Sequence, residues 1–275
     1  MKIDGVLVIH NPQKEMLDNI ERYYPLLSSL FVIDNSITPN HYFVEEVKKL
    51  DKVTYLSLEG NKGIAKALKE GLLLAIEDQA DYCLTIDQDS LFPLGKEKEI
   101  KEYLSKDNGD YGIISLNFNS DTSEKGIKEV DVWIASGNFI NIKNYQLISG
   151  FKEELFIDWV DFDLDEQFHS IGKKIAVIQE ISLSHQIGEP LIRRFLWKKF
   201  PVDNHLPVRY YYLYRNAEIL HRNNKTFYKR LYKGLKRDYI IQLIFGVNRK
   251  EKLKMISRGK RDGKKGILGP YKEAK

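Results

Sequence analysis

The first 90 residues alternate short apolar runs with helical patterns, and this alternation constrains the fold more than any other feature. We expect strands near 6–9, 30–33, 53–56 and 82–86, and helices near 13–23, 39–50 and 64–79. Strands that alternate with helices form a largely parallel sheet covered by those helices. The sequence therefore predicts an α/β fold.

The pattern is looser after residue 110. Further strands are expected near 112–117, 127–135, 174–178 and 181–185, and a helix near 160–171. Beyond Pro190 we expect only helices, with a loosely ordered, glycine-rich ending over Gly259–Gly269. These patterns predict an α/β domain over 1–190 and a helical extension over 191–275.

The same two parts of the chain differ in charge. Residues 191–275 hold 24 Lys and Arg against 6 Asp and Glu, whereas residues 1–190 hold 19 against 33. A basic extension can meet nucleic acid, anionic lipid or an acidic protein face, or can simply be solvated. The segment Tyr228–Phe245 has one basic and one apolar face, as an interfacial helix does. We therefore expect the extension to bind an anionic membrane surface and not nucleic acid.

Several classes of protein do not fit the sequence. The longest apolar runs, 71–76 and 239–247, are far shorter than the ~20 residues of a membrane span. Cys83 is the sole cysteine, which excludes an internal disulfide framework and a cysteine zinc site. The first residues show no secretory apolar region. We expect a cytoplasmic protein that binds peripherally to the inner face of the cell membrane.

Polar side chains follow the expected parallel strands where each one ends, and in such sheets ligands bind at this edge. Asp87 and Asp89 are two residues apart, so in an extended chain they can project to the same side. Such a pair can hold a hard divalent cation together with the oxygens of a nucleoside diphosphate. Asp34 can accept a hydrogen bond from a nucleotide base beside the backbone of Ile9 and His10, or it can form an Asx turn.

The sequence resembles family-2 glycosyltransferases of the GT-A fold, most closely their bacterial rhamnosyltransferase-like branch. The matching pieces cover nearly the whole chain and are Val8–Pro12, Val32–Asn35, Asn61–Ala67 with Gly71, Leu84–Ser90, Ile134–Gly137, Phe156–Asp161, Leu183–His185 and Tyr214–Asn216. The chain departs from the usual pattern at Ile9-His10, where the family has Thr-Tyr, and at Ala135, where it has Thr.

The resemblance implies transfer of a sugar from a nucleoside diphosphate to an acceptor hydroxyl, with inversion at the anomeric carbon. It implies Mn²⁺ or Mg²⁺ held by Asp89, Asp87 and His185. The expected donor-binding residues are Ile9, His10, Asn11, Asp34, Asn61, Gly63, Ala67, Asp87 and Gln88. The expected acceptor-binding residues are Ser136, Gly137, Trp159 and Arg215.

The resemblance assigns the general base to Asp161, and the surrounding sequence is suited to that role. Asp158, Asp161 and Asp163 lie among large apolar residues, which raise the pKa of a carboxyl group and make it a better base. Asp158 is the second candidate and Asp163 the third. Spaced three apart on a helix, Asp158 and Asp161 would share a face, although either could instead cap that helix.

By resemblance, the expected donor is dTDP-L-rhamnose, with UDP-galactofuranose or another UDP-hexose as alternatives. The expected acceptor is a glycan or a polyprenyl-diphosphate-linked sugar of a bacterial surface polysaccharide such as capsule or O-antigen, and the enzyme could be a homodimer. Two other classes stay open. A sugar nucleotidyltransferase also uses paired aspartates, but its glycine-rich N-terminal loop is missing; a non-catalytic module would bind the nucleotide sugar without turnover.

Overall fold

The computed structural model describes the chain except for residues 119–122, 186–190, 196, 203–204 and 273–275. It divides into two compact units. The N-terminal unit comprises Met1–Glu153 and Asp161–His185, and the C-terminal unit comprises Glu154–Val160 together with Gln186–Lys275. The sequence did not predict that the short segment Glu154–Val160 joins the C-terminal unit.

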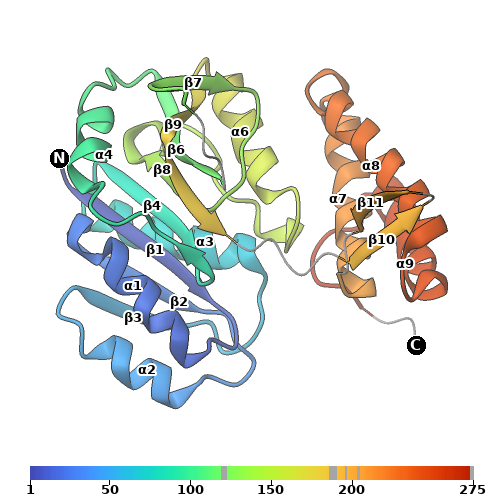
Figure 1. Cartoon of the computed structure of the whole chain (residues 1–275), viewed down its shortest axis with the longest axis horizontal. Coiled ribbons are helices and arrows are strands. Elements are labelled where there is room, and N and C mark those ends of the chain that lie inside the picture. The colour runs from blue at the N-terminus through green and yellow to red at the C-terminus, as the bar shows by residue number, and fades with distance from the viewer. Residues whose placement is uncertain (119–122, 186–190, 196, 203–204, 273–275) are drawn as a thin grey trace. The chain divides into compact units, whose positions relative to one another are not determined.

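The N-terminal unit is built on a mixed sheet with the strand order β3-β2-β1-β4-β8-β6-β9-β5 (Figure 1). The strands β1 to β4 are parallel, β8 runs antiparallel to β4 and β6, β6 is parallel to β9, and β7 pairs with β9. Their bounds are β1 Ile3–Ile9, β2 Leu30–Asp34, β3 Val53–Ser57, β4 Tyr82–Asp87, β5 Ser90–Leu91, β6 Tyr111–Phe118, β7 Ile127–Val130, β8 Asn138–Asn141 and β9 Lys174–His185. The two strands expected near 174–178 and 181–185 are thus one continuous strand.

Helices cover both faces of this sheet, because side chains of a strand point alternately to its two sides. Val6 of β1 faces α3, where a Cβ on Gly71 would lie 2.4 Å from Val6 Cγ1, so glycine permits this close packing. Leu7 belongs to the apolar core with Ile20 and Phe43 of α1 and α2. The helices are α1 Leu17–Tyr23, α2 His41–Lys48, α3 Ile64–Glu77, α4 Glu97–Ser105, α5 Ile142–Tyr145 and α6 Val160–Ser170, with short 3₁₀ turns at Lys14–Met16, Tyr24–Leu26 and Glu153–Leu155.

The sheet register aligns the carboxyl ends of the parallel strands. Ile9 pairs with Asp34, and Asp34 pairs with Ser57. Val8 pairs with Asp87 on the other side of β1. The polar residues singled out in the sequence therefore meet at one edge of the sheet.

Besides Glu154–Val160, the C-terminal unit contains an antiparallel hairpin of β10, Leu191–Phe195, and β11, Lys198–Val202. The helices α7 Pro207–Asn223, α8 Lys225–Phe245 and α9 Arg249–Lys264 follow. The expectation that only helices follow Pro190 is wrong for the hairpin. Its aromatic and branched residues favour strands, and Pro201 disfavours a helix interior.

The glycine-rich ending is also more ordered than expected, since α9 extends through Lys264. A Cβ on Gly259 would lie 2.4 Å from the carbonyl oxygen of Tyr211, and one on Gly263 would lie 2.6 Å from that of Arg215. These glycines let α9 pack directly against the backbone of α7. Among the residues that the structure describes, no helix has the length and apolar character needed to cross a bilayer.

Candidate active site

The loop that precedes α3 is tied to the end of β2 by two asparagines. Asn35 Nδ2 donates to Asn61 Oδ1 at 3.3 Å, and Asn35 Oδ1 accepts from the Lys62 N–H at 2.7 Å. Asn61 Oδ1 also accepts from the N–H of Gly63, whose φ of +91° suits glycine at the start of α3. Ala67 is fully buried within α3, so its methyl group packs in the core and is not presented at the strand ends.

Asp34 orders the turn after β2. Its carboxylate is fully buried; Oδ1 accepts from the Ser36 N–H at 2.8 Å and Oδ2 accepts from the Tyr55 hydroxyl at 2.7 Å. Burial, and then the hydrogen bond to Asp34, raise the pKa of Tyr55 above its ordinary value. The Asx turn that the sequence left open is therefore present. A contact between Asp34 and a nucleotide base stays a prediction.

Gln88 connects the ends of β4 and β1. Its side chain accepts from the His10 N–H at 2.8 Å and donates to the His10 carbonyl oxygen at 3.2 Å. Its own carbonyl oxygen accepts from Asn19 Nδ2 at 3.0 Å. We expected Gln88 to bind the donor, but its amide is used to hold the backbone of His10. The neighbouring Asn11 is held in a similar way, since its N–H donates to Ser36 Oγ at 2.8 Å.

The turn Asp87-Gln88-Asp89 rests on Ser136. The Asp87 N–H donates to Ser136 Oγ at 3.0 Å, and the Ser136 and Ser90 hydroxyls are 2.9 Å apart. Gly137 follows with a φ of +79°, and its N–H donates to the Thr85 carbonyl oxygen at 2.8 Å. We expected Ser136 and Gly137 to bind the acceptor, but both are buried and support the acidic turn. Asp87 is half-buried and Asp89 is exposed.

The sheet brings His185 to this turn. Ser90, which directly follows Asp89, pairs with His185 in the β5–β9 ladder. Two carboxylates and an imidazole offer the oxygen and nitrogen donors that suit Mg²⁺ or Mn²⁺. Among the side chains that the structure describes, which do not include that of His185, no three His, Cys, Asp or Glu residues form a metal cluster. The register brings the backbone of His185 next to the acidic turn, and a cation site at Asp87, Asp89 and His185 stays a prediction.

Asp161 and Asp163 lie in the first turn of α6 in different surroundings. Asp161 is half-buried, and its Oδ1 accepts from the Phe162 N–H at 3.0 Å. Asp163 is buried, bonded to Lys152 Nζ at 2.7 Å and to Gln167 Nε2 at 2.8 Å. Asp163 therefore anchors α6 and is poorly placed to accept a proton from a substrate.

A further aspartate on α6, Asp165, lies close enough to Asp161 for the charge of Asp161 to affect its pKa. Asp165 is buried, and its Oδ2 accepts from the Trp133 N–H at 2.7 Å. Burial raises the pKa of Asp165 well above its ordinary value, and the nearby charge of Asp161 raises it further. Sequence reasoning could not assign a role to Asp165, since its partner lies 32 residues away.

Asp158 lies in the C-terminal unit and precedes α6, with a φ of +63°. The prediction that Asp158 and Asp161 share a helix face is therefore wrong. Asp158 Oδ1 accepts from Nε and Nη2 of Arg209, both at 3.2 Å. Burial raises the pKa of the Asp158 carboxyl, and the Arg209 charge partly opposes this shift.

Two residues expected to bind the acceptor are instead buried within the C-terminal unit. Arg215 is fully buried, and its guanidinium donates to the carbonyl oxygens of Glu154, Leu155 and Gly269. Trp159 is 4% exposed and packs against Tyr228, with ring centroids 5.9 Å apart. Neither side chain is presented to an acceptor, because helix packing uses both of them.

Comparison with known proteins identifies the family. The family model described as glycosyl transferase family 2 matches residues 7–154, which is more than half of the chain. The chain belongs to this family. It is also 26% identical over 242 residues to the dTDP-rhamnosyl transferase RfbF of Shigella flexneri, covering 81% of this chain and 80% of the relative. The protein is therefore a glycosyltransferase similar to rhamnosyltransferases, as the sequence predicted.

Solved structures confirm the GT-A fold. GalNAc-T7 with UDP, GalNAc and Mn²⁺ matches 97% of this chain with a TM-score of 0.63 and 13% identity. TarS of S. aureus matches 95% with a TM-score of 0.55 and 13% identity. This chain spans about half the length of those two proteins, at 56% and 44%. It covers 92% of a shorter TarS chain, residues 1–349 in complex with UDP-GlcNAc, with a TM-score of 0.55 and 13% identity.

Proposed function

We propose that this glycosyltransferase moves L-rhamnose from dTDP-L-rhamnose to an acceptor hydroxyl, with inversion at the anomeric carbon. The proposed acceptor is a glycan or polyprenyl-diphosphate-linked sugar of a bacterial surface polysaccharide. The relative RfbF supports the choice of donor, since it is described as a dTDP-rhamnosyl transferase. The observation that carries the chemistry is the meeting of the Asp87-Gln88-Asp89 turn with the ends of β1 and β9.

On the donor side, Gln88 and Ser136 hold the acidic turn in place, so that Asp87 and Asp89 can bind a cation. His185 is its third proposed ligand. A bound Mn²⁺ or Mg²⁺ supplies positive charge that stabilises the departing nucleoside diphosphate. The same strand ends, at Ile9, His10, Asn11 and Asp34, are proposed to contact the nucleoside.

On the acceptor side, Asp161 is proposed as the general base. Its carboxylate takes the proton of the acceptor hydroxyl while the oxygen attacks the anomeric carbon. The bond from that carbon to the diphosphate oxygen breaks on the opposite face, and its electron pair leaves with dTDP. A positioned base of this kind contributes about 10²–10⁴ in rate. Asp161 is preferred to Asp163 because Lys152 and Gln167 occupy the Asp163 carboxylate.

The C-terminal unit is proposed to bind an anionic membrane surface. On α8, Ile240, Leu243 and Ile244 are 54%, 43% and 52% exposed, and their spacing places them on one helix face. Trp197 is 81% exposed in the β10–β11 hairpin, and the hairpin is joined to α8 where Arg193 Nε donates to the Phe245 carbonyl oxygen at 3.2 Å. Exposed apolar residues within a strongly basic region suit an interfacial contact.

Co-sedimentation with vesicles tests the membrane proposal. The protein should sediment with phosphatidylglycerol-containing vesicles at low salt and much less with pure phosphatidylcholine. Replacing Ile240, Leu243 and Ile244 together by Ser should weaken sedimentation. Leu73→Ser, at an exposed position of α3 in the N-terminal unit, is the control. Equal binding by the triple variant, or no binding by the wild type, would contradict the proposed surface.

A donor screen tests the proposed reaction. Thermal shifts with dTDP, UDP and GDP, each with and without Mn²⁺, should show the largest stabilisation for dTDP with Mn²⁺. Incubation with dTDP-L-rhamnose and a panel of acceptors should release dTDP. Preference for UDP would favour UDP-galactofuranose or a UDP-hexose as donor. Release of pyrophosphate would indicate a nucleotidyltransferase, and binding without turnover across a donor panel would indicate a non-catalytic module.

A further inference from the structure

The segment 131–136 joins β7 to β8 and is hydrogen-bonded to α6 at two points. His169 Nε2 donates to the Asp131 carbonyl oxygen at 2.8 Å, and Asp165 Oδ2 accepts from the Trp133 N–H at 2.7 Å. All of these residues belong to the N-terminal unit. We name residues 131–136 the connecting segment.

The two contacts fit an extended chain that runs antiparallel to the helix. Two residues of extended chain span about 6.6 Å, and four residues of an α-helix span about 6 Å. The step from Asp131 to Trp133 therefore covers one turn of α6, from His169 back to Asp165. The connecting segment thus runs along α6 toward Asp161, the second residue of the helix.

The other end of the connecting segment meets the proposed cation site. The Ala135 carbonyl oxygen accepts from Thr85 Oγ1 at 2.6 Å, and Ser136 Oγ accepts from the Asp87 N–H at 3.0 Å. The connecting segment therefore links the helix that carries the proposed base to the turn that carries the proposed cation ligands.

Trp133 fixes the middle of the connecting segment. Its indole Nε1–H donates to the Leu116 carbonyl oxygen at 3.2 Å, and the centroid of its ring lies 6.1 Å from that of Phe118, so β6 holds its side chain. Its backbone N–H is held by Asp165, which is 1% exposed. The Oδ1 atom of Asp165 has no hydrogen-bond partner among the residues that the structure describes. The role of this buried carboxyl group is therefore the contact with Trp133.

We propose that Asp165 and His169 position Asp161 relative to the Asp87-Gln88-Asp89 turn by fastening α6 to the connecting segment. This inference rests on the proposed function, in which Asp161 is the base and the turn holds the cation. The base and the departing diphosphate act on opposite faces of one anomeric carbon, so their separation must be kept constant. A displacement of about 1 Å can cost about 10²-fold in rate.

Another contact of α6 does not connect it to the acidic turn. Asp163 binds Lys152, which directly precedes the 3₁₀ turn Glu153–Leu155 and lies outside the connecting segment. Lys152→Ala leaves Asp163 without this partner and should lower the melting temperature. Because the connecting segment is untouched, kcat should stay within about twofold of wild type. This variant is the matched control for loss of a contact on the same helix.

Replacement of Asp165 tests the proposal in the full-length enzyme. Asp165→Ala removes the acceptor of the Trp133 N–H, so kcat should fall at least about tenfold, measured as dTDP release from dTDP-L-rhamnose with the panel of acceptors or with water. The donor KM and the thermal shift with dTDP and Mn²⁺ should stay within about twofold. Asp165→Asn keeps an oxygen acceptor and should regain at least about half of the wild-type kcat. Burial raises the pKa of Asp165 well above its ordinary value, so a neutral amide suits the site.

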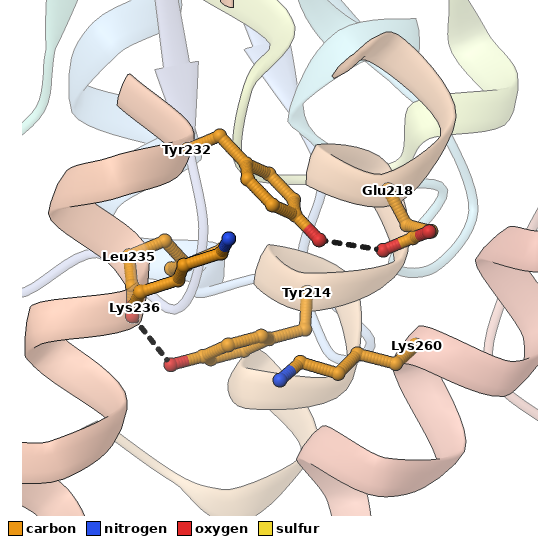
Figure 2. Close-up of a pocket in the computed structure, with 6 residues that line it drawn as sticks. All are labelled: Tyr214, Glu218, Tyr232, Leu235, Lys236 and Lys260. Carbon is orange, nitrogen blue, oxygen red and sulfur yellow. Dashed lines mark hydrogen bonds between the residues drawn. The ribbon is translucent and has the colours of Figure 1, made fainter. Parts of the chain in front are cut away.

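Glu218→Ala supplies a second control, in the C-terminal unit. Glu218 accepts from the Tyr232 hydroxyl at 2.8 Å, and the neighbouring Tyr214 donates to the Leu235 carbonyl oxygen at 3.0 Å (Figure 2). The pocket among these side chains has a cavity volume of about 30 Å³, room for a water molecule, so they serve to pack α7 against α8. The variant should lower the melting temperature and keep the wild-type kcat.

His169→Ala provides an independent measurement if Asp165→Ala does not fold. His169 is half-buried, so its removal should be tolerated. The variant should lose about threefold or more in kcat. His169→Gln, whose amide can still donate to the Asp131 carbonyl oxygen, should restore it.

The outcomes separate the positioning of Asp161 from general stability and from the proposed function. A wild-type kcat in folded Asp165→Ala or His169→Ala, with Asp161→Asn inactive in the same assay, overturns the positioning proposal alone. So does an equal loss of kcat in Lys152→Ala, or an Asp165→Asn enzyme as slow as Asp165→Ala. Full activity of Asp161→Asn would instead overturn the assignment of the base, and the proposed function with it.

Discussion

The side-chain amide of Gln88 hydrogen-bonds to both the N–H and the carbonyl oxygen of His10. The two residues are separated by 78 positions. Their contact continues the pairing of β1 and β4 just beyond the ends of both strands. Because Gln88 stands between Asp87 and Asp89, the contact also fixes the turn on which both carboxylates are carried. The proposed cation site therefore depends on a residue that is not one of its proposed ligands.

Replacing Gln88 by Ala should loosen this turn. Loss of two partly buried hydrogen bonds should lower the free energy of unfolding by about 1–3 kcal/mol and weaken the binding of dTDP with Mn²⁺. Urea unfolding and calorimetric titration measure the two effects. Gln146→Ala, at an exposed position after α5, is the control and should change neither. Wild-type affinity in Gln88→Ala would show that the turn holds its shape without this contact.

Asp89→Asn should remove metal-dependent binding of the donor. The exposed carboxylate of Asp89 offers a cation negative charge that an amide lacks. Titration with dTDP should show that Mn²⁺ tightens binding by the wild type but no longer does so in the variant. Asp110→Asn, at another exposed aspartate, should retain the full effect of Mn²⁺. If Mn²⁺ acts equally on Asp89→Asn, the cation is held elsewhere.

Asp161→Asn should abolish transfer while it preserves donor binding. An amide cannot take the acceptor proton, so kcat should fall by about 10²-fold or more with an unchanged thermal shift for dTDP and Mn²⁺. Asp163→Asn, two residues further along α6, offers a direct comparison. It weakens the contact with Lys152 and should lower the melting temperature with much less effect on turnover. Near wild-type turnover by Asp161→Asn would move the base to another residue.

The strands and helices of the N-terminal unit were predictable because their signals are local. Apolar runs with polar residues at their ends identified β1 to β4, and parallel pairing then required those ends to meet at one edge of the sheet. The Asp87-Gln88-Asp89 turn was found in this way. The same reasoning could not give the partner of Gln88, because hydrogen bonds across 78 residues leave no periodic signal.

The C-terminal unit was less predictable because its structure depends on contacts between residues far apart in the sequence. The segment Gly259–Gly269 has the composition of a loose ending, yet its glycines are suited to close packing of α9 on α7. The expectation that Arg215 binds the acceptor is wrong because sequence alone cannot distinguish a buried arginine, which here binds backbone carbonyl oxygens, from an exposed one. Asn216 of α7 donates to the carbonyl oxygens of Leu155, Ile157 and Asp158, 58 to 61 residues earlier, and no local sequence signal indicates such contacts.

The stability of the fold should depend on pH through Asp4, which is fully buried in β1. Burial, and then the charge of Asp78, raise the pKa of Asp4 from 3.8 to about 7, while Lys2 opposes the shift. Cys83 lies beside Asp4 in the register of β1 and β4, and burial raises the pKa of its thiol well above the ordinary value, so the thiol stays neutral. In the unfolded chain Asp4 should titrate near its ordinary pKa.

The folded state therefore favours the protonated form of Asp4. Its contribution to stability is complete below about pH 4 and is lost as the pH rises toward 7, by up to about 4 kcal/mol in the free energy of unfolding. Asp4→Asn replaces the carboxyl by a neutral group, so the variant should gain stability relative to the wild type as the pH rises. Urea unfolding at pH 5, 6, 7 and 8 measures this difference, with Asp110→Asn as the control. A constant difference between Asp4→Asn and wild type across these values would mean that Asp4 is ionised in the folded protein, and its charge would then have to be balanced within the sheet.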